Sequence, residues 1–205
     1  MVDLSRDDGM TPLDGIIGSA ECPIGGPADA GVVLHERRHR GKLVLRGDPD
    51  DKKFLAGVTK ALGMAPPVTP NTTAGDQETL MVWTAPNEWL VVTEPGAEAG
   101  VSEALSRALS DIHHAVTDTS DQSTIIRLSG NDARTVMAKG CALDLHPRVF
   151  KTGCAAQSHL AQALVCFWQT DDAPSYDIVV RASFAPYLWA WLTDAGLEFG
   201  VRVER

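Results

Sequence analysis

The segment from residue 118 to residue 161 gathers side chains that could carry out nucleophilic or acid–base chemistry. In a hydrolytic triad a histidine takes the proton of a serine, and a carboxylate orients the histidine. The segment offers these residue types at Asp118, Ser120, Asp121, Ser123, Asp144, His146 and His159. No Gly-x-Ser-x-Gly turn frames either serine. We therefore expect ordinary turn and capping roles for these side chains, and we predict no catalytic residue on this chain.

A second candidate site is the loop at residues 143–157. Irregular loops carry a large share of the binding and catalytic side chains of proteins. This loop holds His146, Phe150, Cys154 and Gln157. Cys154 follows Lys151 and Gly153, and a neighbouring cation can activate a thiol. His146 and Cys154 are therefore the residues that a ligand-binding loop would use.

Metal and nucleotide sites have little support in the sequence. The four cysteines show neither a C-x-x-C pair nor a zinc-site spacing with histidine, so we expect reduced thiols in packing roles at Cys22, Cys141, Cys154 and Cys166. His113 and His114 are predicted to end a helix, where a cationic ring suits the negative end of the helix dipole. Gly15 and the pair Gly25-Gly26 match no phosphate-binding fingerprint. We predict no cofactor-binding and no metal-binding residue.

Composition limits the kind of partner. The chain has 205 residues, with 27 acidic and 18 basic side chains and a formal charge of −9. Nucleic acid and anionic membrane surfaces attract clustered lysine and arginine, so we expect neither as a partner. No apolar run approaches the ~20 residues that span a bilayer, and the N-terminus lacks a signal-peptide pattern. These features predict a cytoplasmic protein.

One basic run stands out in this acidic chain, HERRHRGK at residues 35–42. Charge on a strand edge discourages edge-to-edge aggregation, which favours a solvated edge here. The same charges would also suit docking onto an acidic partner surface. The sequence leaves both interpretations open.

The elements that must position these residues repeat along the chain. In the first half a strand, a helix, a hairpin and a second helix are predicted at 42–46, 51–62, 79–93 and 100–113. In the second half a strand, a helix, two strands, a helix and a last strand are predicted at 124–129, 132–139, 159–169, 176–181, 184–193 and 199–203. Two ferredoxin-like β-α-β-β-α-β passes follow, which predicts an α+β fold of mixed sheets with helices.

Domain boundaries come from the same patterns. Residues 1–33 are rich in Gly, Asp and Pro without periodicity, which is typical of an N-terminal arm that wraps the domain or trails from it. Residues 34–205 predict a single domain made of two pseudo-repeats, at about 42–117 and 118–205.

The tryptophans of the predicted strands and of the last helix raise a separate question. Trp83 and Trp168 lie in apolar strands and are expected in the core. Trp189 and Trp191 are two residues apart, so they point to different sides of their helix. The side that does not face the sheet then needs cover, either from the rest of this chain or from a partner protein.

Several short motifs, taken in order, resemble those of one family. They are Leu45-Arg46-Gly47-Asp48, Pro86-Asn87-Glu88-Trp89-Leu90, Asp118-Thr119-Ser120-Asp121-Gln122, Leu128-Ser129-Gly130, Leu143-Asp144-Leu145-His146-Pro147 with Phe150, and Arg181-Ala182-Ser183-Phe184. Over residues 34–203 the chain resembles the gamma subunits of heterotetrameric sarcosine oxidases. Gamma-like subunits of N-methylglutamate dehydrogenase and similar demethylating complexes resemble it as well.

The resemblance implies a small non-catalytic subunit that stabilises a large flavoenzyme. That enzyme oxidises sarcosine or another N-methyl amine and passes the one-carbon unit to tetrahydrofolate. The partners implied are the large flavoprotein subunits. FAD, FMN, NAD, tetrahydrofolate and zinc are then expected on other subunits, with none on this chain.

A more distant resemblance suggests an alternative. Residues 118–133 are similar to the start of the folate-binding domain of glycine-cleavage aminomethyltransferases, and residues 151–157 to a Lys-Gly-Cys…Gln loop of folate-dependent repair proteins. A stand-alone folate-binding protein or aminomethyltransferase-like enzyme would use the His146–Gln157 loop. The departures are Thr152 between Lys and Gly, Ser158 in place of an acid, and no glycine-rich acidic turn at 163–168. We therefore expect loop packing or a subunit contact from His146, Phe150 and Cys154, rather than chemistry.

Overall fold

The computed structural model describes residues 9–205, which divide into two compact units. Among the described residues, the first unit comprises Gly9 and residues 39–120. The second unit comprises residues 10–38 and 121–205. The N-terminal segment therefore belongs to the same unit as the C-terminal half of the chain.

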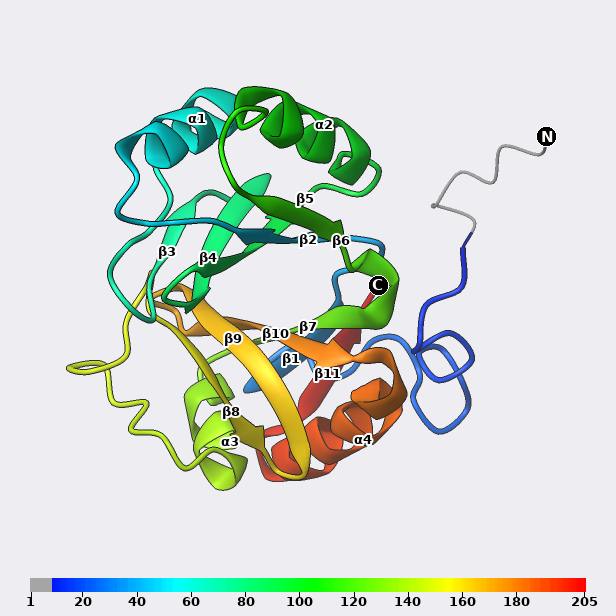
Figure 1. The fold of residues 1–205 in the computed structure, drawn as a ribbon. Helices are drawn as coiled ribbons and strands as arrows, with labels where there is room; N and C mark the ends of the chain where they lie inside the picture. The colour runs from blue at the N-terminus through cyan, green and yellow to red at the C-terminus, as the bar shows by residue number, and fades with distance from the viewer. Residues whose placement is uncertain (1–8) are drawn as a thin grey trace. The chain divides into compact units, whose positions relative to one another are not determined.

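The first unit is an antiparallel five-stranded sheet in the order β3-β4-β5-β2-β6, with α1 and α2 on one face (Figure 1). Its elements are β2 (Gly41–Arg46), α1 (Lys52–Leu62), β3 (Thr73–Gly75), β4 (Thr79–Ala85), β5 (Glu88–Thr93), α2 (Glu98–Ala108) and β6 (Ala115–Asp118). Asp51 caps α1 by accepting a hydrogen bond from Lys53 N at 2.8 Å, and Gly63 ends it with φ 73°. The core between sheet and helices contains Leu43, Leu45, Phe54, Val58, Met81, Trp89, Val91, Leu105 and Leu109.

The second unit is a six-stranded sheet in the order β11-β1-β7-β10-β9-β8, with α3 and α4 on one face (Figure 1). Its elements are β1 (Val32–Glu36), β7 (Ser123–Ser129), α3 (Ala133–Gly140), β8 (Ala155–Leu160), β9 (Ala163–Asp171), β10 (Ser175–Arg181), α4 (Ala185–Gly196) and β11 (Val201–Glu204). Only the β1–β11 pair is parallel among the described pairs, so the sheet is mixed. Short 3₁₀ turns occur at Ser120–Gln122, Ala182–Phe184 and Leu197–Phe199.

The core of the second unit is built from alternate residues of its strands. Ala163, Val165 and Phe167 of β9 point to the helix-covered face, as do Tyr176, Ile178 and Val180 of β10. Leu188, Trp189 and Leu192 of α4 close the core from the other side. Leu13 and Cys22 of the N-terminal segment belong to the same cluster, so this segment is part of the core.

The predicted α+β class, with repeated passes and two helices to each sheet, is confirmed. The two units repeat one order of elements, β-α-β-β-β-α-β, which has one strand more than predicted. The single strand predicted at 159–169 is wrong, because the chain turns back after Leu160 through Ala161, whose φ is 52°. Strands β1 and β3 have no counterpart in the prediction, and β6 is the closing strand of the first predicted pass, for which no residues were given.

Candidate functional site

Ser120 is buried and its hydroxyl serves the backbone of the first unit. The hydroxyl donates a hydrogen bond to Asp118 Oδ1 at 2.5 Å and accepts one from Lys42 N at 2.9 Å. Ser120 N also donates to Asp118 Oδ1, at 2.9 Å. The Asp-x-Ser motif thus fastens the end of β6 to the start of β2. A hydroxyl held this way has a carboxylate, not an imidazole, as its proton acceptor.

The other side chains considered for a triad are spread over the Ser120–Gln122 3₁₀ turn, which holds Asp121, over β7 and β8, and over the loop after α3. Ser123 begins β7, and His159 is an exposed residue of β8. His146 is exposed in the loop after α3, where its Nδ1 accepts a hydrogen bond from Arg148 N at 3.2 Å. Asp144 Oδ1 accepts a hydrogen bond from His146 N at 2.9 Å. Asp144 and His146 therefore form a local turn, consistent with the turn roles expected from the sequence.

The loop at residues 143–157 is held from beneath by Arg134 of α3. Its guanidinium donates to the carbonyls of Leu145 and Phe150 and to Gln169 Oε1, the last at 3.2 Å. The Phe150 ring packs against Phe167, with centroids 5.3 Å apart. The space beneath this loop is thus filled by an aromatic ring and an arginine.

Tyr176 lies beside this support and has an unusual hydroxyl. The residue is fully buried, and its hydroxyl has no hydrogen-bond partner among the described residues. Burial raises the pKa of Tyr176 to about 12, so the phenol stays protonated at neutral pH. Arg134 lies 5.8 Å from the ring centroid, a cation–π distance. The ring therefore works as a packing surface for Arg134 and Phe150.

The cysteines are free thiols in the described structure. Cys22 and Cys141 are buried, and Cys154 and Cys166 are partly exposed. Cys154 Sγ lies 3.9 Å from the Val149 carbonyl inside the loop. Although Cys166 as a residue is partly exposed, its thiol is buried, and this burial raises the thiol pKa to about 12 and keeps it in the unreactive protonated form. Within residues 9–205, no group of three or more His, Cys, Asp or Glu side chains could hold a metal ion.

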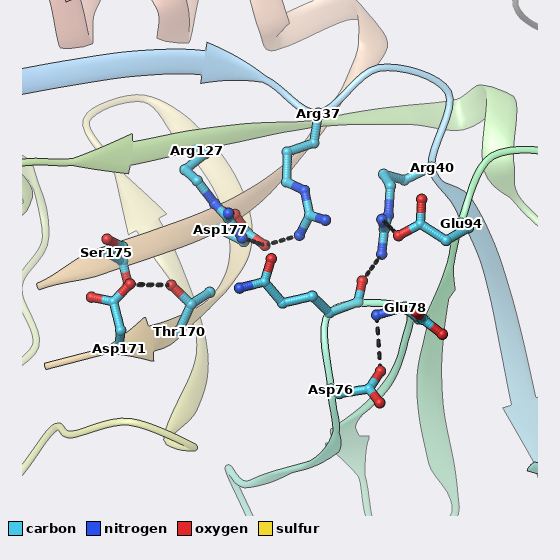
Figure 2. Close-up of polar contacts among 11 residues, drawn as sticks. Arg37, Arg40, Asp76, Glu78, Glu94, Arg127, Thr170, Asp171, Ser175 and Asp177 are labelled. Atoms are coloured by element: carbon cyan, nitrogen blue, oxygen red, sulfur yellow. Dashed lines mark hydrogen bonds and ion pairs between the residues drawn. The ribbon is translucent and has the colours of Figure 1, made fainter. Parts of the chain in front are cut away.

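The basic run at residues 35–42 is not a solvated strand edge, so that interpretation is wrong. The run leaves β1, turns at His39 with φ 54°, and enters β2. In the second unit, Arg37 Nη1 and Arg127 Nε donate to opposite oxygens of Asp177 at 2.8 and 2.7 Å (Figure 2). The Asp177 side chain is 1% exposed. Arg37 is therefore used in a buried ionic cluster.

Two further arginines of the run also have internal partners. Arg38 pairs with Asp14 at 2.7 Å in the second unit. In the first unit Arg40, only 4% exposed, pairs with Glu94 and donates to the Gln77 carbonyl (Figure 2). Because these cations are neutralised within their own units, they offer little charge for an acidic partner.

His113 and His114 do not end a helix, contrary to the prediction, because α2 stops at Ala108. The His114 ring instead donates from Nδ1 to the Ile112 carbonyl at 2.8 Å. Both rings line an open pocket of about 460 Å³ in the first unit, together with Arg46, Gly47, Asp48, Pro49, Asn87 and Ala115. Arg46 is already paired with Glu88 at 2.5 Å.

The α4 tryptophans are covered by this chain. Trp189 is 1% exposed, and its Nε1 donates to Cys22 Sγ at 3.2 Å. Trp191 lies on Gly140, where an added Cβ would come within 2.5 Å of the indole ring. Intramolecular packing thus accounts for Trp189 and for the part of Trp191 that lies against the core. Gly15, which matched no phosphate-binding motif, lines a pocket beside α4, and Gly25 forms a bridge with Val203 of β11.

Ser120, Arg134 and Asp177 are therefore used to build their own units, whereas His146 and His159 are exposed. None of the helices within residues 9–205 is both long and apolar enough to cross a bilayer. Each unit is a sheet and two helices held by internal hydrogen bonds and ion pairs, and the second unit has a groove at its surface. Sequence reasoning missed Arg134 and Asp177, since a lone arginine on a helix and a lone aspartate in an apolar strand carry no motif.

Comparisons with known proteins give a consistent result. A family model described as sarcosine oxidase, gamma subunit, matches residues 46–198. Sarcosine oxidase subunit gamma of Corynebacterium sp. strain P-1 is 34% identical over 181 residues, which are 88% of this chain and 87% of that protein. The subunit gamma of Arthrobacter sp is 32% identical over 181 residues, with the same shares of both chains.

Two solved structures have folds similar to that of this chain. A chain of heterotetrameric sarcosine oxidase from Corynebacterium sp. U-96 aligns with a TM-score of 0.83 and 30% identity, covering 93% of this chain and 95% of that chain. Glycine-cleavage aminomethyltransferase T from Bartonella henselae aligns with a TM-score of 0.64 over 88% of this chain and 52% of that one, at 13% identity, which is a likeness of fold alone. Since the family model and the relatives span most of its length, the chain belongs to the sarcosine oxidase gamma subunit family.

Proposed function

We propose that this chain is the non-catalytic gamma subunit of a heterotetrameric sarcosine oxidase. Family membership over most of the chain is the observation that carries the proposal. In this role the chain adds a folded surface to an enzyme complex. It transfers neither protons nor electrons itself.

The use of the reactive side chains supports the non-catalytic part. Ser120 is hydrogen-bonded to Asp118 and to Lys42 N, and the Arg134 guanidinium donates to carbonyls of the 143–157 loop. A catalytic serine needs a free base within hydrogen-bond reach, and a ligand-binding loop needs space beneath it. Phe150 and Arg134 fill the space under the His146 loop, which argues against a tetrahydrofolate site beneath it.

The partners would be the large flavoprotein subunits of the complex, and the complex would be cytoplasmic. FAD, FMN, NAD, tetrahydrofolate and zinc would be bound by those other subunits. This chain would form one folate-binding-domain-like scaffold of two pseudo-repeats. The complex as a whole would demethylate sarcosine oxidatively and transfer the one-carbon unit to tetrahydrofolate.

Co-expression with the other subunits tests the proposal. We expect the chain to co-purify with them in a fixed stoichiometry, and to show no flavin absorbance when purified alone. A chain that remains a monomer in the presence of those subunits at micromolar concentration would refute the assignment. Activity with sarcosine and with N-methylglutamate then separates a sarcosine oxidase from a related N-methyl amino acid dehydrogenase.

Calorimetric titration of the isolated chain with tetrahydrofolate tests the non-catalytic part. We expect no binding heat. Saturable binding that is lost in His146→Ala or Cys154→Ala would instead support a folate-binding protein. Val149→Ala is the matched control, because this exposed neighbour lies in the same loop and has no ligand-binding chemistry.

A further inference from the structure

A groove runs between the N-terminal segment and α4 in the second unit. Its volume is about 550 Å³. It is lined by Gly15, Ile16, Ser19, Ala20, Glu21 and Cys22 on one side and by Trp189, Ala190, Thr193, Asp194 and Leu197 on the other. In Figure 1 the segment appears as the blue loops beside α4. Both walls belong to one compact unit.

The walls of the groove are fixed by the core. Leu13 is fully buried, and Cys22 accepts the hydrogen bond of Trp189. Ile16 N and Ile17 N donate to the Leu13 carbonyl at 3.0 and 3.1 Å, which closes a turn between these anchors. A groove whose walls are held at both ends needs little ordering when a partner binds.

An exposed stripe of α4 continues from the groove. Tyr187, Ala190 and Asp194 are spaced at helical intervals and share one face. Phe184 and Leu197 extend this stripe at its two ends, with 43% and 64% of their surface exposed. The Phe184 and Tyr187 rings meet edge to face at 6.4 Å, and Tyr187 Oη accepts a hydrogen bond from Gln162 N. Exposed, fixed aromatic rings of this kind are enriched in protein interfaces.

The charge of the groove has a single sign. Glu21 and Asp194 are its two charged lining residues, and no lysine or arginine is among the described residues that line it. Neither carboxylate has an ion-pair or side-chain hydrogen-bond partner within residues 9–205. By contrast, the carboxylates of Asp14, Glu36 and Asp177 in the same unit are all paired with arginine.

We propose that this groove and the α4 stripe form a contact surface for another subunit of the complex. The segment that docks there would present apolar side chains to Phe184, Tyr187 and Leu197, and lysine or arginine to Glu21 and Asp194. Charge complementarity selects this occupant, because an acidic segment would meet two unneutralised carboxylates. The inference rests on the proposed function and adds to it the docking surface and the chemistry of the partner.

The test compares variants of the full chain co-expressed with the other subunits. Glu21→Lys combined with Asp194→Lys reverses the charge of the groove. Glu78→Lys combined with Asp111→Lys is the matched control, since it changes the net charge equally at exposed carboxylates of the first unit. Circular dichroism melting of each purified chain verifies the fold. Binding of the purified chain to the purified remaining subunits is then measured by surface plasmon resonance.

We expect the groove variant to bind at least about tenfold more weakly, because two attractive contacts become repulsive, and the control to bind like the wild type. Added salt should weaken wild-type binding more than binding of the groove variant. Phe184→Ala with Leu197→Ala should also weaken binding, with the salt dependence kept. Groove-variant binding within about twofold of wild type, or an equal loss in the control, would overturn the inference.

Two outcomes separate this inference from the proposed function. If the wild-type chain does not associate with the other subunits, both fail together. If the wild-type chain and every variant associate equally well, the proposed function stands and the docking surface is wrong. Self-association of the isolated chain that the groove variant abolishes would assign the groove to a second copy, and would also overturn the inference.

Discussion

The two units of the molecule share one order of elements but complete their sheets differently. In the first unit, β2 pairs directly with β6. In the second unit the corresponding strands, β7 and β11, are separated by β1, which pairs antiparallel with β7 and parallel with β11. The added strand comes from the N-terminal segment, ahead of the first unit in sequence. The second sheet is therefore incomplete without residues far from it along the chain.

The inserted strand also brings a buried carboxylate, Glu36, and leads into a cluster of two arginines around one aspartate. Glu36 at the end of β1 is 3% exposed and accepts hydrogen bonds from Thr11 and Thr124 at 2.8 and 2.7 Å. Arg37 then enters the cluster around Asp177. In the first unit the β2–β6 join uses backbone and hydroxyl contacts, Thr119 N to the Lys42 carbonyl and Lys42 N to Ser120, and the Ser120 hydroxyl in turn donates to the Asp118 carboxylate. We therefore expect the cluster around Asp177 to contribute more to stability than the Ser120 contacts at the β2–β6 join.

The largest expected effect follows from removing the shared carboxylate. Asp177→Asn leaves Arg37 and Arg127 without their anion, and an uncompensated buried charge typically costs ~3–5 kcal/mol. Urea denaturation of the purified chain measures the free energy of unfolding. A loss below about 1 kcal/mol would show that the cluster is as weak as an exposed pair. Glu88→Gln, which breaks the more exposed Arg46 pair, is the control.

The inserted strand also shows why part of the fold escaped prediction. The strands and helices with clear apolar periodicity, such as α1 and the β4–β5 hairpin, were predictable because their own residues bury one face. Strand β1 has the sequence VVLHE and runs straight into the basic cluster, so its charges resemble a solvated edge. The partner of Arg37, Asp177, lies 140 residues away in the sequence, and no local pattern encodes that pairing.

Like the fold, the candidate site could be predicted from the sequence only where its features are local. The Asp118-x-Ser120 motif and the 143–157 loop could be found from residue types and family motifs, because these are local. Their structural use depends on Lys42 N and on Arg134, which reach them from other elements. The sequence predicted an N-terminal arm that wraps the domain or trails from it. Only the structure shows that Cys22 of this arm accepts a hydrogen bond from Trp189. Tertiary contacts of this kind decide between a reactive and a structural role.

A smaller effect is expected from the Ser120 contacts at the β2–β6 join of the first unit. Ser120→Ala removes an acceptor from Lys42 N and a donor from Asp118, which should lower the free energy of unfolding by ~1–3 kcal/mol. Sarcosine turnover by the assembled complex should be unchanged at temperatures where the variant is folded. Turnover that fell a hundredfold in an intact complex would instead mark Ser120 as catalytic. Ser123→Ala serves as the control serine.

The inserted strand should also make stability depend on pH. Burial, and then the charge of Arg127, lower the pKa of His35, which lies between Arg127 and Glu204 across the sheet and near Arg37 and Asp177. A lowered pKa means that the unfolded chain binds a proton more readily than the folded chain below pH ~6.5. Stability from this group is thus fully present above that pH and is lost as pH falls towards the folded pKa. Melting temperatures between pH 5 and 8 should show a drop that His35→Gln reduces, and an unchanged profile would contradict the assignment.

The smallest effect should come from an exposed ion pair of the first unit. Glu103 and Arg107 lie one turn apart on α2, with 72% and 75% of their side chains exposed. Exposed pairs at this spacing contribute ~0.3–0.5 kcal/mol, so Glu103→Gln should barely change the free energy of unfolding, and salt should remove the difference. Urea denaturation at low and high salt measures both. A loss as large as that of Asp177→Asn would mean that burial does not distinguish this exposed ion pair from the cluster around Asp177.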